Sequence, residues 1–210
     1  SILDLKRENF GPILHVVRFR ADQLGQVVED INSTGYGLTM GLHSRLEATR
    51  EFVEARARVG NFYVNRNQIG AVVGSQPFGG EGLSGTGPKA GGPHYLRRFR
   101  RAAQRQSPTG EGETATAAMI AEHFPDNQRG GWATRADRVG ALRKLLRGKA
   151  ADAVSAAAGL DAGPYDLPAP TGEANTLMLV PRGRVLCLGP DPDLLLMQAV
   201  QALAIGNAVL

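Results

Sequence analysis

The sequence has 210 residues, 42% of them apolar, and a mean hydropathy of −0.19, values ordinary for a globular protein of one large or two small domains. No stretch holds about 18 uninterrupted apolar residues, and no basic segment followed by an apolar run opens the chain, so neither a membrane span nor a signal peptide is predicted. We therefore expect a cytoplasmic protein.

The net charge of +4 and the isoelectric point near 9.6 raise nucleic acid as a partner. The excess of basic residues is local and lies in two runs: Arg97, Arg98, Arg100, Arg101 and Arg105, then Arg135, Arg138, Arg143, Lys144, Arg147 and Lys149. Phe99 is the single aromatic residue within these runs, and neither run has the series of aromatic stacking residues or the recognition-helix motif that nucleic-acid readers usually carry. We expect solvated faces or subunit contacts here, and no nucleic acid.

The first 65 residues alternate between strand and helix patterns. The expected elements are a strand at 13–19, a helix at 21–34, an extended segment at 36–44, a helix at 45–60 and a strand at 61–65. In the first helix Leu24, Val27, Val28 and Ile31 recur at helical spacing, and Gly35 is its stop signal. This order predicts an α/β layer with at least some parallel strand pairing.

Residues 66–93 lose this pattern and hold nine of the 27 glycines. Gly80, Gly82 and Gly85 form G-x-G-x-x-G, a motif that binds dinucleotide phosphates when a strand precedes it and a helix follows it. No strand pattern precedes it here, and the prolines at 88 and 93 forbid a regular helix after it. The alternative is that the glycines let the backbone pass close to a ligand or to another strand.

Regular structure is expected to restart at 94–101, and residues 106–114 have linker composition. Further on we expect a helix at 136–159, a break at 161–170, strands at 175–180 and 184–189, a helix at 193–206 and a strand at 207–210. The last three open a βαβ unit. The sequence thus predicts a first domain at 1–105, a linker at 106–114 and a second domain at 115–210.

Three blocks carry a resemblance to a known family: "ENFGPIL" at 8–14, "GNFYVN" at 60–65 and "PFGGEGLSGTG" at 77–87. In this order and spacing they resemble the C-terminal third of an aldehyde dehydrogenase catalytic domain. The stretch "GAVVGSQPFGGEGLSGTGPKAGGPHYL" is similar to the Δ1-pyrroline-5-carboxylate (glutamate semialdehyde) dehydrogenase branch, in particular to that module of the bifunctional proline utilization A family. The resemblance covers residues 1 to about 100.

The resemblance implies a cofactor-binding role for Glu8 and Phe10. In the family, the glutamate of E-x-F-G-P accepts hydrogen bonds from the nicotinamide ribose of NAD, and the phenylalanine packs beside the nicotinamide ring. The residue types suit these roles, since a carboxylate only accepts hydrogen bonds and an aromatic face positions a ring without competing for its protons. "ENF" alone is equally a strand-entry turn with a solvated glutamate and a core phenylalanine.

The resemblance also implies a substrate site in the loop ahead of "PFGG". In the semialdehyde branch, backbone N–H groups of this loop hold the substrate α-carboxylate; here they belong to Gly70 and Ala71. Phe78 would pack against the aliphatic chain of the substrate. A nest of backbone donors suits a carboxylate because it supplies positive charge without ordering long side chains. The alternative for Phe78 is a core anchor of the loop.

No catalytic residue is expected in this chain. Family members attack the aldehyde with a cysteine that precedes the matched blocks, whereas the single cysteine, Cys187, follows them in an apolar strand pattern. One cysteine also excludes an internal disulfide and fits a reducing compartment. The four histidines share no ligand spacing, so no metal site is expected. The nucleophile and the dinucleotide-binding half should lie upstream of Ser1, and this chain alone should be inactive.

Residues 180–210 resemble the early cofactor-domain βαβ unit of the same family. The family's P-W-N-F-P turn reads Gly189-Pro190-Asp191-Pro192-Asp193 here, without its tryptophan and its oxyanion asparagine, and two acidic residues would repel a pyrophosphate. Residues 115–210 resemble the beginning of the C-terminal domain of longer proline utilization A proteins, which has an aldehyde-dehydrogenase-like fold without activity; the resemblance implies that it covers the catalytic module and assists assembly. An unrelated α/β domain is the alternative.

The leading hypothesis is a fragment of an NAD-dependent glutamate-semialdehyde dehydrogenase, with FAD in a fused proline dehydrogenase domain if one lies upstream. Its partners would be glutamate semialdehyde, the remainder of the same polypeptide and further copies in a homo-oligomer. The second hypothesis is a non-catalytic assembly or lid module of the same fold.

Overall fold

The computed structural model describes residues 1–69, 71–99, 131–159 and 163–210. The chain forms two compact units. The first unit comprises Ser1–Arg101 and Leu167–Asn175, and the second unit comprises Ala102–Asp166 and Thr176–Leu210. The predicted linker at 106–114 lies outside the described residues, so the predicted domain boundaries stay a prediction.

The first unit alternates short strands and helices, as predicted. In chain order its elements are η1 (Ile2–Asp4), η2 (Ala21–Gln23), α1 (Leu24–Ser33), β1 (Tyr36–Gly37), β2 (Thr39–Leu42), α2 (Glu47–Glu54), β3 (Asn61–Val64), β4 (Glu81–Gly82) and η3 (Tyr95–Phe99), where η marks a 3-10 helix. The predicted stop of the first helix is confirmed, because Gly35 follows α1 with a φ of +77°.

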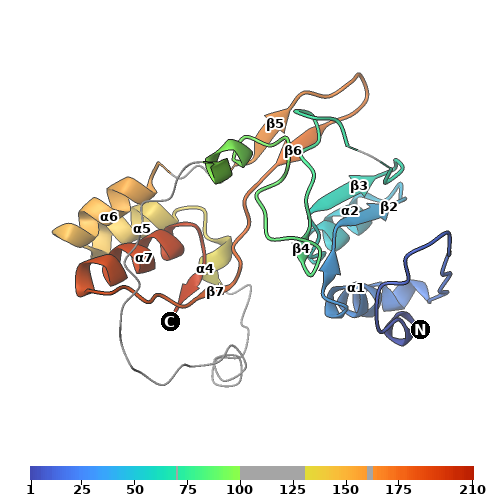
Figure 1. Cartoon of the computed structure of the whole chain (residues 1–210), viewed down its shortest axis with the longest axis horizontal. Helices are drawn as coiled ribbons and strands as arrows, with labels where there is room; N and C mark the ends of the chain where they lie inside the picture. The colour runs from blue at the N-terminus through green and yellow to red at the C-terminus, as the bar shows by residue number, and fades with distance from the viewer. Residues whose placement is uncertain (70, 100–130, 160–162) are drawn as a thin grey trace. The chain divides into compact units, whose positions relative to one another are not determined.

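The strands β2 and β3 form a parallel pair with α2 between them in the chain, so the predicted parallel pairing is confirmed (Figure 1). Thr39 lies opposite Asn61 and Leu42 opposite Val64. Along β3 the first and third residues, Asn61 and Tyr63, are buried, and the other two are half-buried. Asn61 therefore places an amide side chain on the inner face of β3.

The helix expected at 45–60 ends early, at Glu54. Asn32 at the end of α1 explains this difference. Its Nδ2 donates to the carbonyl oxygen of Arg56 at 2.9 Å, and its Oδ1 accepts from the backbone N–H of Arg58 at 2.9 Å. These tertiary hydrogen bonds occupy backbone groups that a longer helix would need.

The strand expected at 13–19 is absent, and that prediction was wrong for the structure described here. These residues form no ladder, and Leu14 and Val16 are 87% and 76% exposed. The preference of β-branched residues for strands reflects packing against neighbouring strands, and the described residues offer this segment no such neighbour.

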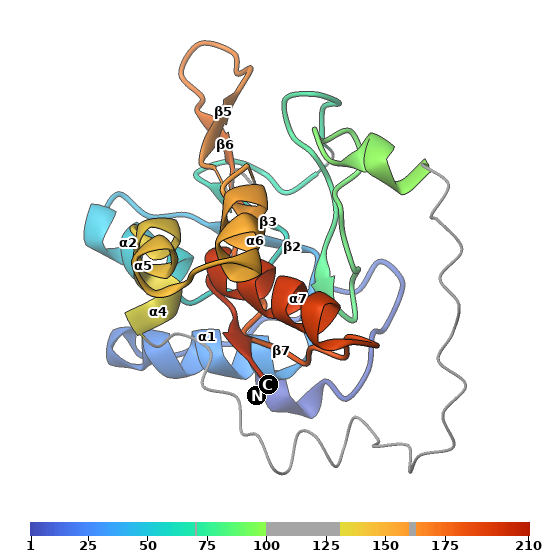
Figure 2. The same cartoon turned by 90° about the vertical axis from the view of Figure 1, so that its left-hand side faces the viewer.

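The second unit consists of α4 (Gly131–Thr134), α5 (Arg138–Leu145), α6 (Lys149–Ala157), β7 (Arg184–Val185), α7 (Pro192–Ala204) and β8 (Ala208–Val209). Its core lies where α6 and α7 pack together, around Val154 and Val200, which are almost fully buried (Figure 2). The strands β7 and β8 pair in parallel, so the predicted βαβ opening is confirmed.

The single helix expected at 136–159 is two helices in the structure. Gly148 separates α5 from α6 with a φ of +57°, a left-handed conformation that other residues rarely adopt. The apolar stripe continues across the break, because Leu142 and Val154 share one core cluster.

A further two-stranded sheet joins β5 (Tyr165–Leu167) to β6 (Asn175–Leu177). The segment between these strands belongs to the first unit, although nearly all of its sequence neighbours belong to the second. Across the described residues, no helix is both long and apolar enough to cross a membrane.

Candidate functional site

The turn "PFGG" at 77–80 is attached to the start of β3 by the side chain of Asn61. The amide Nδ2 donates to the carbonyl oxygen of Pro77 at 2.9 Å, and Oδ1 accepts from the N–H of Gly79 at 3.2 Å. Asn61 is 9% exposed. One buried amide thus fixes the turn relative to the start of β3.

Lys89 also connects the turn to the start of β3. Its ammonium group donates to the carbonyl oxygen of Gly60, to the carbonyl oxygen of Gly79 at 2.9 Å and to Oδ1 of Asn61 at 2.9 Å. Burial lowers the pKa of Lys89, and the nearby carboxylate of Glu81 partly opposes that shift. We call Asn61, Lys89 and the turn 77–80 the clasp.

Phe78 is held by its own backbone. Its N–H donates to the carbonyl oxygen of Ala90 at 3.0 Å, and the N–H of Ala90 donates back to Phe78 at 2.9 Å, which forms an isolated antiparallel bridge. The Phe78 ring is half-buried. The backbone is thus fixed at both ends of the turn, and the partly exposed ring is available to contact another group.

The glycines of this region permit close backbone contact. A Cβ at Gly60 would collide with the carbonyl group of Gly79, and a Cβ at Gly37 would collide with the carbonyl oxygen of Arg58. Gly82 has a φ of +57° and lies opposite Tyr36 in the β1–β4 pair. This is the close strand approach that we expected as the alternative to phosphate binding.

The G-x-G-x-x-G motif does not have the surroundings of a dinucleotide fingerprint. Its middle glycine belongs to the two-residue strand β4, which pairs antiparallel with β1. The described residues after Gly85 form no helix before η3. Backbone N–H groups at a helix start, which hold the pyrophosphate in such motifs, are therefore missing from this part of the chain.

The loop 66–76 leads from β3 to the clasp and contains the two predicted anchor residues. Ala71 is exposed, and Gly70 lies outside the described residues. Just before the loop, Asn65 takes a φ of +55°, and its side chain exchanges two hydrogen bonds with the backbone of Ser44 at 2.9 and 3.0 Å. Asn65 thus shapes the exit of the chain from β3.

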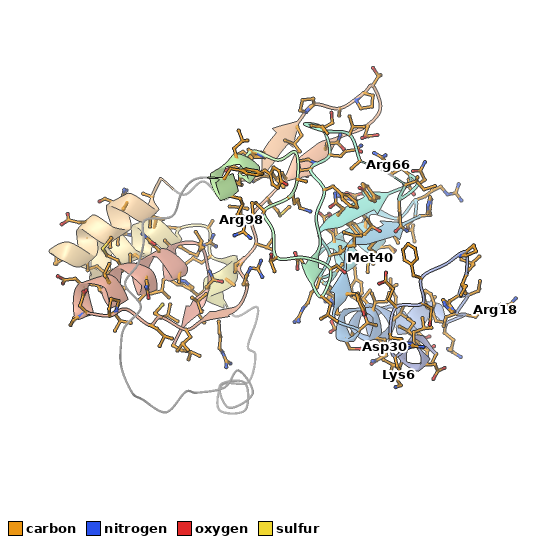
Figure 3. The ribbon with its side chains drawn as sticks, viewed as in Figure 1. Lys6, Arg18, Asp30, Met40, Arg66 and Arg98 are labelled. Atoms are coloured by element: carbon orange, nitrogen blue, oxygen red, sulfur yellow. The ribbon has the colours of Figure 1, made fainter. Side chains whose placement is uncertain are left out.

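Glu8 and Phe10 lie in the N-terminal segment that carries Lys6 and Arg18 in Figure 3. Phe10 is 96% exposed, and the exposed Glu8 forms no hydrogen bond or ion pair with the described residues. The structure brings Ala71 and Phe78 into one loop region, but it forms no described contact between Glu8 or Phe10 and the clasp.

Sequence reasoning missed the side chains that hold this region together: Asn61, Lys89 and Glu173. A polar residue at a buried position of a strand was the available signal for Asn61, since buried amides are nearly always hydrogen-bonded. No local signal marks Glu173, whose partners Arg66 and Gln76 lie about half the chain away.

Cys187 in the second unit is 6% exposed, and its N–H donates to the carbonyl oxygen of Leu210 at 3.1 Å, beyond the β7–β8 pair. The turn before α7 ends in Asp191, whose Oδ1 accepts from the N–H of Leu194 at 2.9 Å. The start of α7 is therefore capped by a carboxylate of the chain itself.

The family comparison decides the identity of the first unit, since residues 4–104 match the model of the aldehyde dehydrogenase family. The chain carries an aldehyde dehydrogenase family domain. The predicted resemblance is thereby confirmed, and the clasp and the loop 66–76 both lie within this aldehyde dehydrogenase domain.

Relatives extend the match beyond the aldehyde dehydrogenase domain. The chain is 46% identical over 212 aligned positions to the bifunctional protein PutA of Rhizobium meliloti, a match that covers 100% of this chain and 16% of that protein. It is 46% identical over 92 residues to 1-pyrroline-5-carboxylate dehydrogenase of a Geobacillus strain, covering 44% of this chain and 18% of the relative. The chain thus spans about one sixth of the length of the PutA protein that it matches.

A solved structure supports the fold. Proline utilization A of Corynebacterium freiburgense superposes with a TM-score of 0.63 at 27% identity, covering 89% of this chain and 18% of that one. The predicted α/β fold of the aldehyde dehydrogenase type is confirmed by this neighbour and by the alternating helices and strands.

Proposed function

We propose that this chain is part of an NAD-dependent L-glutamate-γ-semialdehyde (Δ1-pyrroline-5-carboxylate) dehydrogenase, which oxidises the aldehyde to glutamate in proline catabolism. The main support for this proposal is the 46% identity to a bifunctional PutA protein along the whole chain. A shorter match to a 1-pyrroline-5-carboxylate dehydrogenase agrees with it. We further propose a fused proline dehydrogenase domain with FAD elsewhere in the polypeptide.

The proposed substrate site is the loop 66–76 together with Phe78. The backbone N–H groups of Gly70 and Ala71 hold the α-carboxylate of the semialdehyde, and the Phe78 ring packs against its methylene chain. Three features support this site: the exposure of Ala71, the half-buried ring of Phe78 and the fixed backbone of the clasp.

The proposed cofactor contacts are Glu8 and Phe10, and bound NAD supplies the hydride acceptor. The residues fit the group: the exposed carboxylate of Glu8 has no partner in the described chain, and the ring of Phe10 is 96% exposed. Glu8 accepts two hydrogen bonds from ribose hydroxyls, and Phe10 offers a flat apolar face.

The reacting thiol of this enzyme is proposed to lie elsewhere in the polypeptide, upstream of Ser1. Cys187 does not fit the role because it is buried beside a strand pair in the second unit. The gene sequence upstream of Ser1 tests this proposal. A cysteine-bearing nucleophile loop of the aldehyde dehydrogenase type supports it, and a coding sequence that lacks one contradicts it.

For the second unit alone we propose a non-catalytic assembly or lid role. The carboxylates of Asp191 and Asp193 lie at the start of α7, and Asp191 already accepts a hydrogen bond from the N–H of Leu194 there. A pyrophosphate at this helix start would meet two negative charges.

Two substitutions in the full-length enzyme separate the proposed sites. Phe78→Ala should raise the KM for the semialdehyde by about tenfold or more, because the substrate loses an aromatic packing surface. Glu8→Ala should raise the KM for NAD by about tenfold, because two hydrogen bonds to a charged acceptor are lost. Steady-state kinetics with each substrate varied measures both.

Each variant is the control for the other. The KM for NAD should stay within about twofold in Phe78→Ala, and the KM for the semialdehyde should do so in Glu8→Ala. Unchanged constants for both substrates in both variants would remove the site assignments.

A further inference from the structure

One carboxylate oxygen joins the two ends of the loop 66–76. Glu173 Oε1 accepts a hydrogen bond from Arg66 Nη1 at 2.9 Å and another from Gln76 Nε2 at 2.7 Å. Arg66 follows β3, and Gln76 directly precedes the clasp turn. Glu173 lies 107 positions after Arg66 and 97 positions after Gln76. It belongs to the segment between β5 and β6, which is part of the first unit.

This contact differs from a surface ion pair. The side chains of Arg66 and Glu173 are 28% and 27% exposed, whereas those of the surface pair Arg50 and Glu47 are 37% and 68% exposed. The guanidinium of Arg66 also lies 5.1 Å from the ring centre of the buried Tyr63 on β3, so the sheet helps to orient it toward the carboxylate. A charge-assisted hydrogen bond in such surroundings is stronger than an exposed one.

The other partner of Glu173, Gln76, also forms hydrogen bonds with the backbone inside the loop. Its Oε1 accepts from the N–H of Val72 at 3.3 Å, and its backbone N–H donates to the carbonyl oxygen of Val72 at 2.7 Å. The amide group of Gln76 therefore faces Glu173 with one atom and the backbone beside Ala71 with the other. If Glu173 moved, the Gln76 side chain would lose its position, and the backbone of Val72 beside Ala71 would lose a fixed partner.

We infer that Glu173 is a positioning residue that holds the loop 66–76 in the shape needed to bind the substrate carboxylate. This inference rests on the proposed function of the loop. Backbone donors bind an anion well only when they converge before the anion arrives, since ordering a free loop costs binding energy. Glu173 supplies that order without touching the substrate.

The test uses Glu173→Ala, Glu173→Gln, Arg66→Ala and the double variant Arg66→Ala/Glu173→Ala in the full-length enzyme. Glu47→Ala is the matched control, because Glu47 also pairs with an arginine but lies on α2. Steady-state kinetics gives kcat and both KM values, and hydrogen exchange followed by mass spectrometry reports the order of the loop 66–76.

In Glu173→Ala we expect the KM for the semialdehyde to rise about tenfold, with kcat and the KM for NAD within about twofold of the wild type. Glu173→Gln should show a smaller rise because it keeps an acceptor oxygen. The double variant should be no worse than Glu173→Ala, since Glu173→Ala alone already removes the Arg66–Glu173 contact that Arg66→Ala removes. Exchange should accelerate within the loop 66–76, and Glu47→Ala should change none of these values.

An unchanged KM for the semialdehyde in Glu173→Ala would overturn the inference, and so would an equal loss of kcat in every variant, which indicates misfolding. If the wild-type enzyme does not oxidise the semialdehyde, the proposed function fails. Hydrogen exchange then still decides the role of Glu173: faster exchange confined to the loop supports it, and unchanged exchange overturns it.

Discussion

Gly60→Ala should open the junction between β3 and the clasp. The added Cβ would collide with the carbonyl oxygen of Gly79 and lie 2.7 Å from its carbonyl carbon and 2.8 Å from the Cα of Gly80. Both neighbours are backbone, and the clasp hydrogen bonds hold them in place, so the strain cannot be relieved by a rotamer change. We expect a loss of about 3 kcal/mol of local stability.

Hydrogen exchange of the β3 amides in the full-length protein measures this loss, which should accelerate exchange roughly a hundredfold. Gly25→Ala in α1 is the control, since its Cβ would meet only the ring of Phe52 at 3.4 Å and alanine favours a helix. Slow exchange of β3 in Gly60→Ala would show that the close approach of strand and turn is not needed.

Lys89→Met should also loosen the clasp, although it changes side-chain volume very little. The substitution leaves the carbonyl oxygens of Gly60 and Gly79 without their donor and removes one partner of Asn61. An unpaired buried acceptor costs about 1–3 kcal/mol, and these two carbonyl oxygens belong to half-buried residues, so we expect a loss near the lower end for the pair, about 2–3 kcal/mol. The KM for the semialdehyde should rise as well, since Phe78 lies within the clasp turn.

Lys6→Met, at an exposed lysine, is the control and should stay within about 0.5 kcal/mol of the wild type. Unchanged β3 exchange in Lys89→Met would contradict the account of the clasp.

The pH dependence gives a second readout of Lys89. Burial lowers its pKa in the folded state below the ordinary value of 10.5, so the unfolded state binds more protons between the lowered pKa and 10.5. Stability of the wild type relative to Lys89→Met should therefore rise as the pH rises through this alkaline window. A relative stability that falls there would contradict the lowered pKa.

The layout of the fold was predictable because local signals coincide with tertiary structure. The apolar spacing around Val28 and the stop at Gly35 located α1, and the strand pattern at 61–65 located β3. The strand prediction for 13–19 was wrong because β-branched residues form a strand only beside a neighbouring strand, and the described residues contain none next to this segment. The break at Gly148 was missed because a single glycine within a helical pattern is often tolerated.

The clasp and the Glu173 contact were not predictable from local patterns. Asn61, Lys89 and Glu173 act through partners between 10 and 107 positions away, and such polar contacts depend on which chain segments meet after folding. For the glycine-rich stretch, the sequence predicted close contact between backbone segments but not which residues meet. The structure identifies Gly60 and Gly79 as such a pair.

The central claim is that the loop 66–76 holds the carboxylate of the substrate while Glu8 holds the cofactor ribose. A crystal structure of the full-length enzyme with glutamate and NAD tests it most directly. We predict the α-carboxylate about 3 Å from the backbone nitrogens of Gly70 and Ala71, the methylene chain against Phe78, and the ribose hydroxyls on Glu8. Amides turned away from glutamate, or Glu8 distant from the ribose, would contradict the account.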